Sequence, residues 1–318
     1  MILRFARVSP RRAGRFQPLK SEEVTPKFLD RTIRALKRWG YDIVSLDEVC
    51  RRAVIMEQQR RFVCLTFDGC YKDLIATAYP ILSRHRVPFT VYIPTAFPDR
   101  VGEAWWLALE QIIAKESRIS LMIDRTERHF TIRTIAEKRE LFEFLRNRMR
   151  QLAPGEASVA VRDLCKRYSV DLDAVSRDAS MGWSDLVRLA DDPLVTFGSA
   201  TVNYPALSKI KDAHAAREMQ MGRAVAETAL HRELKHFAYP YGDRDSFRRA
   251  HVVMAEELGF DSAVSTISGI VAPEGGTNLR ALPRIVWNGR QTSLRVMRVL
   301  LSGVMFEPVM PTPSKPLL

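Results

Sequence analysis

Side chains that could carry chemistry gather in three short segments of the 318-residue chain. The segments are LTFDGCYKD at 65–73, VTFGSATVNYPALSKI at 195–210 and FAYPYGD at 237–243. Each lies where a β-rich run passes into a loop or a helix. In parallel α/β sheets and barrels, that edge of the sheet is where binding and catalytic sites form. We therefore expect the three segments to meet in one site.

The first segment contains an acid and a thiol. Asp68 could serve as a general base, or it could accept backbone N–H bonds where its strand ends, and the sequence leaves both interpretations open. Cys70 has no histidine near it in the sequence, so an inert thiol is expected. The cysteines form no CxxC pair, which predicts neither a disulfide framework nor a zinc site; they are Cys50, Cys64, Cys70 and Cys165.

Among the six histidines, His236 enters a predicted strand. A lone histidine without partners in the sequence favours a hydrogen-bonded structural role.

The surrounding sequence alternates strands with helices of about ten residues or more, which is typical of parallel strands joined by crossover helices. The first helix is marked by Thr25 as N-cap, Pro26 at the first helical position and Gly40 after the end. Strands are predicted at 2–5, 42–45, 61–67, 88–93, 194–197, 236–239, 262–266 and 282–286, and helices at 25–40, 71–85, 183–190, 212–234, 246–258 and 292–301.

This alternation is interrupted between residues 102 and 182. Within that span the pattern predicts helices at 104–115, 135–152 and 158–168 and a hairpin at 119–132. We therefore predict an α/β fold with one domain made of residues 1–101 and 183–303, a mostly helical inserted subdomain at 102–182, and a disordered Pro-rich tail at 304–318.

Taken together, in this order and spacing, the three segments resemble the polysaccharide deacetylases, the carbohydrate esterases of family 4 related to the nodulation protein NodB. The passages WGYDIVSLDEV, YPILSRHRVPFTVYIPT and ALPRI and the tandem Trp105 and Trp106 extend the resemblance over nearly the whole chain. The resemblance implies a distorted (β/α) barrel of about seven strands. It also implies metal-dependent hydrolytic removal of N-acetyl groups from carbohydrates.

The metal ligands that the resemblance would require are replaced in this chain. The family's first motif reads Thr-Phe-Asp-Asp-Gly, in which the first Asp is the base and the second binds a divalent metal such as zinc. Asp68 matches the base, whereas the ligand position is Gly69. The two histidines of the second motif correspond to Ala200 and Tyr204. We therefore expect no metal cofactor, because a catalytic zinc site ordinarily has three protein ligands.

Other site residues follow from the same resemblance. The backbone N–H of Tyr241 would face the developing oxyanion, and the family's late general-acid histidine has no counterpart. Of Trp105 and Trp106, we expect one to lie in the core and the other to stack on a sugar. Arg284 could reach an acidic ligand group or pair with Asp68, and we favour the ion pair. The predicted substrate-binding residues are Tyr71, Trp105, Tyr204, Tyr239 and Arg284. The aromatic rings of Tyr71, Tyr204, Tyr239 and Tyr241 would line the mouth of the site and suit sugar faces.

The composition of the chain limits the kinds of molecule that it is expected to bind. The net charge of +12 could attract nucleic acid, anionic lipid or an acidic polymer. Lys and Arg are interleaved with Asp and Glu, and no nucleic-acid-reading motif accompanies them, so no specific nucleic-acid partner is expected. No long apolar run or signal-like start is present, which predicts a cytoplasmic or peripheral protein without a transmembrane segment. Because Ile2 to Phe5 already reads as a strand, upstream sequence could be missing, and nothing indicates the oligomeric state.

Three hypotheses for the function follow. The first is a catalytically impaired pseudo-enzyme that binds an acetylated sugar, a lipid-linked sugar or a partner protein through the former active site. The second is a residually active carbohydrate deacetylase that hydrolyses a non-peptide C–N bond. The third is an interaction module whose basic insertion at 102–182 contacts an anionic partner.

Overall fold

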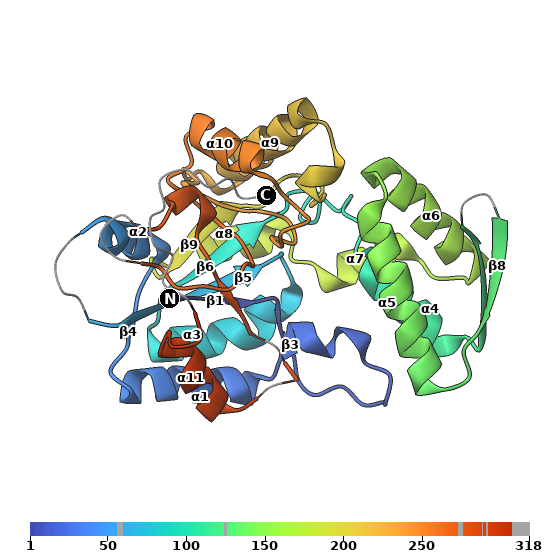
Figure 1. Cartoon of the computed structure of the whole chain (residues 1–318), viewed down its shortest axis with the longest axis horizontal. Coiled ribbons are helices and arrows are strands. Elements are labelled where there is room, and N and C mark those ends of the chain that lie inside the picture. The colour runs from blue at the N-terminus through green and yellow to red at the C-terminus, as the bar shows by residue number, and fades with distance from the viewer. Residues whose placement is uncertain (56–59, 124–125, 273–275, 288, 291, 307–318) are drawn as a thin grey trace.

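The computed structural model describes residues 1–55, 60–123, 126–272, 276–287, 289–290 and 292–306. A curved parallel sheet with the strand order β11-β10-β9-β6-β5-β1-β12 forms the centre of the larger lobe (Figure 1). A further strand, β4, pairs with the first residues of β5 along the edge where β1 pairs farther on. The strands are β1 Ile2–Phe5, β4 Asp42–Ile43, β5 Phe62–Asp68, β6 Phe89–Ile93, β9 Val195–Ser199, β10 His236–Ala238, β11 Ser262–Val264 and β12 Ile285–Val286.

The segment 282–286 joins the two ends of this sheet. Leu282 forms a parallel bridge with Val264 at the end of β11. Ile285 then pairs with Leu3 of β1. This short segment therefore closes the sheet into a ring, and the predicted distorted barrel is confirmed.

Seven α-helices of the described chain surround the barrel. They are α1 Pro26–Arg38, α2 Leu46–Val54, α3 Tyr79–His85, α8 Trp183–Ala190, α9 Asp212–Leu230, α10 Arg249–Glu257 and α11 Leu294–Leu301. A π-helical turn, η2 Leu74–Ala78, leads into α3. The hydroxyl of Thr25 accepts a hydrogen bond from the Phe28 N–H, as its predicted role of N-cap requires. The apolar sides of α1, α3, α8 and α11 and the end of α9 form one core with strand residues. The buried residues of α2 belong to a second cluster, and those of α10 and the start of α9 to a third.

A second lobe, at the right of Figure 1, is built by the inserted segment. It contains α4 Trp105–Lys115, the antiparallel hairpin β7 Arg118–Ile123 and β8 Thr126–Thr131, α5 Ile135–Gln151, α6 Pro154–Arg167 and α7 Leu172–Ala179. Its apolar side chains form a cluster of their own, which Leu19 and Phe97 join from the barrel side. The short turn η1 Pro18–Glu22 packs against α5, and β2 Arg7–Val8 pairs with β3 Glu23–Val24 nearby.

Two helices were not expected from the sequence, α2 and α7. Both begin at an N-cap, since Ser45 accepts from the Glu48 N–H and Asp171 accepts from the Ala174 N–H. In addition, α6 begins at Pro154 rather than at 158. Of the tail predicted to be disordered, residues 307–318 lie outside the described residues. No helix in the described ranges is both long and apolar enough to cross a bilayer.

Candidate functional site

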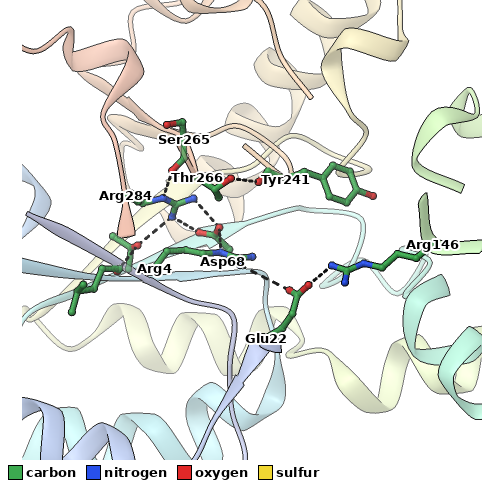
Figure 2. A network of polar contacts seen from close by, with 10 residues as sticks. Arg4, Glu22, Asp68, Arg146, Tyr241, Ser265, Thr266 and Arg284 are labelled. Atoms are coloured by element: carbon green, nitrogen blue, oxygen red, sulfur yellow. Dashed lines mark hydrogen bonds and ion pairs between the residues drawn. The ribbon is translucent and has the colours of Figure 1, made fainter. Parts of the chain in front are cut away.

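Asp68, at the carboxyl end of β5, is the centre of the predicted site, and two arginines bind it. Arg284 donates through Nη1 to Oδ1 at 2.6 Å and through Nη2 to Oδ2 at 2.8 Å. Arg4, on the neighbouring strand β1, donates through Nε to Oδ2 at 2.8 Å. Figure 2 shows this network, in which both carboxylate oxygens face guanidinium groups. Bidentate Arg–carboxylate bonds of this kind are among the strongest that proteins make.

The Asp68–Arg284 pair is buried. The side chain of Arg284 is fully buried, and its Nε donates to the Ser265 carbonyl at 2.7 Å. Burial alone would raise the pKa of Asp68, but the charges and hydrogen bonds of Arg284 and Arg4 outweigh it and hold that pKa below its usual value. The favoured ion pair is therefore confirmed. Arg284, also predicted to contact substrate, is not among the described residues that line the cavity next to Asp68.

The three positions that correspond to metal ligands offer no convergent donors. Gly69 has no side chain and adopts a φ of +84°. A Cβ at this position would stand 3.0 Å from the Tyr71 ring, so that ring occupies part of the space a ligand would need. Ala200 is fully buried in an apolar cluster with Tyr92 and Ala238. Within the described part of the chain, no three His, Cys, Asp or Glu side chains come together in a way that could hold a metal ion.

Tyr204 is the third of these positions, and its phenol lies in the electrostatic field of Asp68 and Arg4. Burial raises the pKa of Tyr204, and the negative charge of Asp68 raises it further. Arg4 and a hydrogen bond from the Tyr241 backbone oppose this rise. The phenol therefore stays neutral and is a poor metal ligand. The backbone of Tyr241, predicted to supply the oxyanion donor, thus lies next to the Tyr204 oxygen.

A cavity of about 200 Å³ opens next to this group, between the barrel and the inserted lobe. Four of the predicted aromatic residues line it, namely Tyr71, Trp105, Tyr204 and Tyr241. Tyr204 and Tyr241 contact each other with ring centroids 5.3 Å apart, and both have positive φ angles. Side chains from distant parts of the sequence thus form one aromatic wall, as the three-segment pattern predicted.

Tyr239, also predicted to bind substrate, is buried and is not among the described residues that line this cavity. Its ring stacks on Phe247 at a centroid distance of 4.2 Å, and its hydroxyl donates to the Arg280 carbonyl at 2.8 Å. Tyr239 and Tyr241 are two residues apart, but both follow the end of β10 at Ala238, and Tyr241 has a left-handed backbone. Their side chains consequently serve different regions.

The tandem tryptophans do not divide into one core and one exposed residue. Trp105 and Trp106 are both partly buried, both line the cavity and contact each other edge to face at 5.5 Å. Trp106 also packs on Phe97, at 6.1 Å. Both indoles are therefore within reach of a ligand in the cavity.

Ion pairs connect the barrel to the inserted lobe across this cavity. Glu22 of η1 pairs with Arg146 of α5 and lies 3.9 Å from Arg4. One turn farther along α5, Arg150 pairs with Asp243 and lies 4.5 Å above the Tyr241 ring. The Asp68 network thus extends through Arg4 and Glu22 into the second lobe (Figure 2).

Sequence reasoning missed Arg4, Glu22, Arg146 and Arg150. Only Arg4 gave a usable signal, because a charged residue within the apolar strand ILRF needs a buried partner. In register it lies beside Thr66, two residues before Asp68. The other three depend on how the inserted lobe packs against the barrel, which no local pattern encodes.

Cys70 and His236, for which the sequence predicted no catalytic role, are both buried. Burial raises the pKa of the Cys70 thiol, as expected for an inert cysteine. His236 is buried and hydrogen-bonds through Nδ1 to Ser262 Oγ at 2.9 Å and through Nε2 to Asp47 Oδ1 at 3.2 Å. It lies at the start of β10, and these hydrogen bonds confirm its structural role.

Comparisons with known proteins agree with this fold. Residues 163–263, about a third of the chain, match the family described as polysaccharide deacetylase. A deacetylase of Streptococcus pyogenes, solved with acetate, has 17% identity and a TM-score of 0.60 over 94% of this chain and 96% of its own. A putative polysaccharide deacetylase from Bacillus anthracis has 13% identity and a TM-score of 0.57 over 95% of this chain and 68% of its own.

A third structure is the deacetylase domain of BpsB from Bordetella bronchiseptica. It has 14% identity and a TM-score of 0.53, over 90% of this chain and 94% of its own. No curated protein matches the sequence. The resemblance inferred from the three segments is confirmed by the family match over residues 163–263, and the fold is confirmed by the solved structures.

Proposed function

We propose that this protein of the polysaccharide deacetylase family binds a sugar-containing ligand in its aromatic cavity without hydrolysing it. The family relationship supports a carbohydrate as the ligand class. The chemistry of the site residues argues against the family's reaction. We therefore expect the protein to bind the ligand and to leave its acetyl groups in place.

The observation that carries this proposal is the double ion pair of Asp68. A general base needs a free lone pair within reach of the proton that it removes. Three N–H donors of Arg284 and Arg4 already occupy three of the roughly four acceptor sites of the Asp68 carboxylate. A carboxylate with a lowered pKa is also a weaker base, so this residue is poorly suited to remove a proton from water.

The side chains at the three metal-ligand positions also argue against hydrolysis. In the family, a divalent ion would supply a water nucleophile by lowering the pKa of that water from 15.7 to about 7. Gly69 and Ala200 cannot coordinate, and the neutral phenol of Tyr204 is a poor ligand. We infer that the chain uses no metal cofactor. The guanidinium of Arg4 supplies a positive charge next to Asp68 in its place.

The aromatic wall supplies what sugar binding needs. Flat rings can lie against the C–H faces of a sugar, while polar groups at the rim orient its hydroxyls. Trp105 and Tyr241 stand on opposite sides of the lobe boundary, on α4 and on the loop after β10. Arg146 and Arg150 provide hydrogen-bond donors at the same rim.

Two assays on the purified chain test the proposal. Incubation with N-acetylglucosamine oligomers and added zinc should release no acetate above a blank. Titration of the same oligomers, followed by tryptophan fluorescence and calorimetry, should show saturable binding. Trp105→Ala should weaken that binding by about tenfold or more, since one lost stacking contact is worth about 1.5 kcal/mol.

Phe144→Ala is the matched control, because Phe144 is an exposed aromatic residue of the same lobe outside the cavity. Its affinity should equal that of the unmodified chain. Acetate release that depends on Asp68 would instead favour a residually active deacetylase. Failure of every acetylated oligomer to bind would remove the sugar-binding half of the proposal.

A further inference from the structure

The positive charge of the chain is concentrated in its first 101 residues. That segment holds 19 Lys and Arg against 10 Asp and Glu, a net charge of +9 out of the total of +12. The inserted segment 102–182 holds 14 against 13 and is almost neutral. The hypothesis of a basic insertion is therefore wrong, and a surface for anionic partners has to be sought on the barrel.

Helix α1 presents a uniformly basic surface. Its apolar side packs into the barrel core, and its exposed side chains are all basic; they are Lys27, Arg31, Arg34, Lys37 and Arg38. The helix also contains Asp30, which is largely buried and bound by Arg34, Arg84 and His85. The carboxylate is therefore already neutralised within the protein.

Several of these cations have no acidic partner. Within the described ranges, no carboxylate forms an ion pair with Lys27, Arg31 or Arg38. Like charges along one helix side repel each other and lower its stability. Such a surface is better explained by an anionic partner than by the needs of the fold.

Helix α11 adds exposed aliphatic side chains to exposed arginines. Arg295 and Arg298 alternate with Val296 and Val299, which are 39% and 51% exposed. After the helix ends, Val304 and Met305 are 86% and 65% exposed. The opposite side of α11 is buried through Met297 and Leu301. The solvent-exposed side of this helix therefore carries valines as well as arginines.

The two helices lie side by side on the barrel wall, as Figure 1 shows. The guanidinium of Arg298 lies 5.8 Å from the centroid of the Trp39 ring at the end of α1. The Tyr41 hydroxyl donates to the Leu301 carbonyl at 3.0 Å. We call this surface, formed by the exposed residues of α1 and α11 and by residues 304–305, the α1–α11 face. None of its residues lines the aromatic cavity.

We propose that the α1–α11 face binds the surface of a membrane that contains anionic lipids. Lys and Arg near such a surface are attracted by the acidic headgroups. Exposed valine and methionine side chains can insert between those headgroups, as the apolar sides of interfacial helices do. A nucleic acid would use the cations but would leave the aliphatic side chains in water. The combination therefore favours lipid.

Vesicle flotation with the full chain tests this inference. The vesicles contain phosphatidylcholine alone, or equal parts of phosphatidylcholine and phosphatidylglycerol. The chain should float only with the second kind. The triple variant Lys27→Glu, Arg31→Glu and Arg295→Glu should bind on the order of 100-fold more weakly, because each basic residue contributes about a factor of five near an anionic surface.

The matched control reverses three exposed basic residues of the inserted lobe, with Lys115→Glu, Arg118→Glu and Arg128→Glu. Both triple variants lower the net charge by six, so they differ only in which surface of the protein is changed. The control should float like the unmodified chain. Equal loss in both variants would show a general charge effect and overturn the proposal.

A second variant, Val296→Ser with Val299→Ser, tests the aliphatic contribution without changing charge. It should bind anionic vesicles at least fivefold more weakly, since moving a valine side chain out of water is favourable and a serine side chain gains much less. Unchanged vesicle binding would contradict lipid insertion. Binding of a fluorescent single-stranded RNA that only the first triple variant loses, together with no flotation, would assign the face to nucleic acid instead.

Discussion

At the scale of single residues, the site is defined by what surrounds Asp68. A carboxylate that would act as a base is here the acceptor for two guanidinium groups, and its pKa is lowered as a consequence. Arg284 is buried completely and has no other carboxylate partner in the described residues. The pair therefore stabilises the barrel, and removing Asp68 would leave the charges of Arg284 and Arg4 without a partner.

Asp68→Asn should destabilise the fold strongly. Removal of one member of a buried ion pair leaves an unpaired charge and typically costs about 3–5 kcal/mol. Urea unfolding of the purified chain measures the difference. Arg188→Gln, which removes an exposed pair with Asp185, is the control and should change the free energy of unfolding by less than about 1 kcal/mol. A cost for Asp68→Asn as small as that of the control would contradict a structural role.

The lowered pKa of Asp68 also predicts how stability depends on pH. A carboxyl whose folded-state pKa lies below its unfolded-state value stabilises the fold above the unfolded value, near pH 4, and loses that contribution as the pH falls through the folded value. The difference in unfolding free energy between the unmodified chain and Asp68→Asn should therefore be constant from neutral pH to about pH 5. It should shrink below about pH 4. A difference that already shrinks between pH 7 and 5 would indicate a raised pKa and would favour a catalytic acid or base.

At the scale of elements, the strand ends were predictable and the contacts between loops were not. The motif segments follow β5, β9 and β10, and hydrophobic patterning placed those strands within two residues of their observed ends. The side-chain directions at Tyr239 and Tyr241 could not be predicted, because the positive φ of Tyr241 depends on the packing of the loop. The same holds for Tyr71, whose ring fills space next to Gly69.

This packing predicts that restoring the three metal ligands is not sufficient. The combined variant Gly69→Asp, Ala200→His and Tyr204→His should bind zinc weakly, since a side chain at 69 would meet the Tyr71 ring at 3.0 Å. Addition of Tyr71→Ala should tighten zinc binding at least tenfold in calorimetry. Tyr71→Ala alone should bind none. Equal affinities of the triple and quadruple variants would show that Tyr71 does not obstruct the site.

At the scale of the whole molecule, two lobes meet over the cavity and are tied by ion pairs. The division of the chain at 102 and 182 followed from a break in the strand–helix alternation, and the inserted lobe has its own apolar cluster. What the sequence did not indicate is how that lobe faces the barrel. Pairs such as Arg150–Asp243 join residues 93 positions apart and depend on the assembled fold.

Arg150→Met should loosen the contact between the lobes. The pair is partly exposed, with Arg150 at 23% and Asp243 at 42%, so its loss should raise hydrogen exchange in the loop 240–246 and the last turn of α5 by no more than about fivefold. High salt should cause the same rise in the unmodified chain, because screening weakens the pair. Salt should then have no further effect on Arg150→Met. Identical exchange in both proteins would show that the pair does not hold the lobes together.

An equilibrium titration of the metal-free chain with zinc, performed beside Asp68→Asn, shows whether the site can hold a metal ion. With Asp68 held by Arg284 and Arg4, and with Gly69 and Ala200 unable to coordinate, we predict no stoichiometric binding at micromolar zinc in either protein. One equivalent of zinc bound tightly by the unmodified chain and lost in Asp68→Asn would contradict the account.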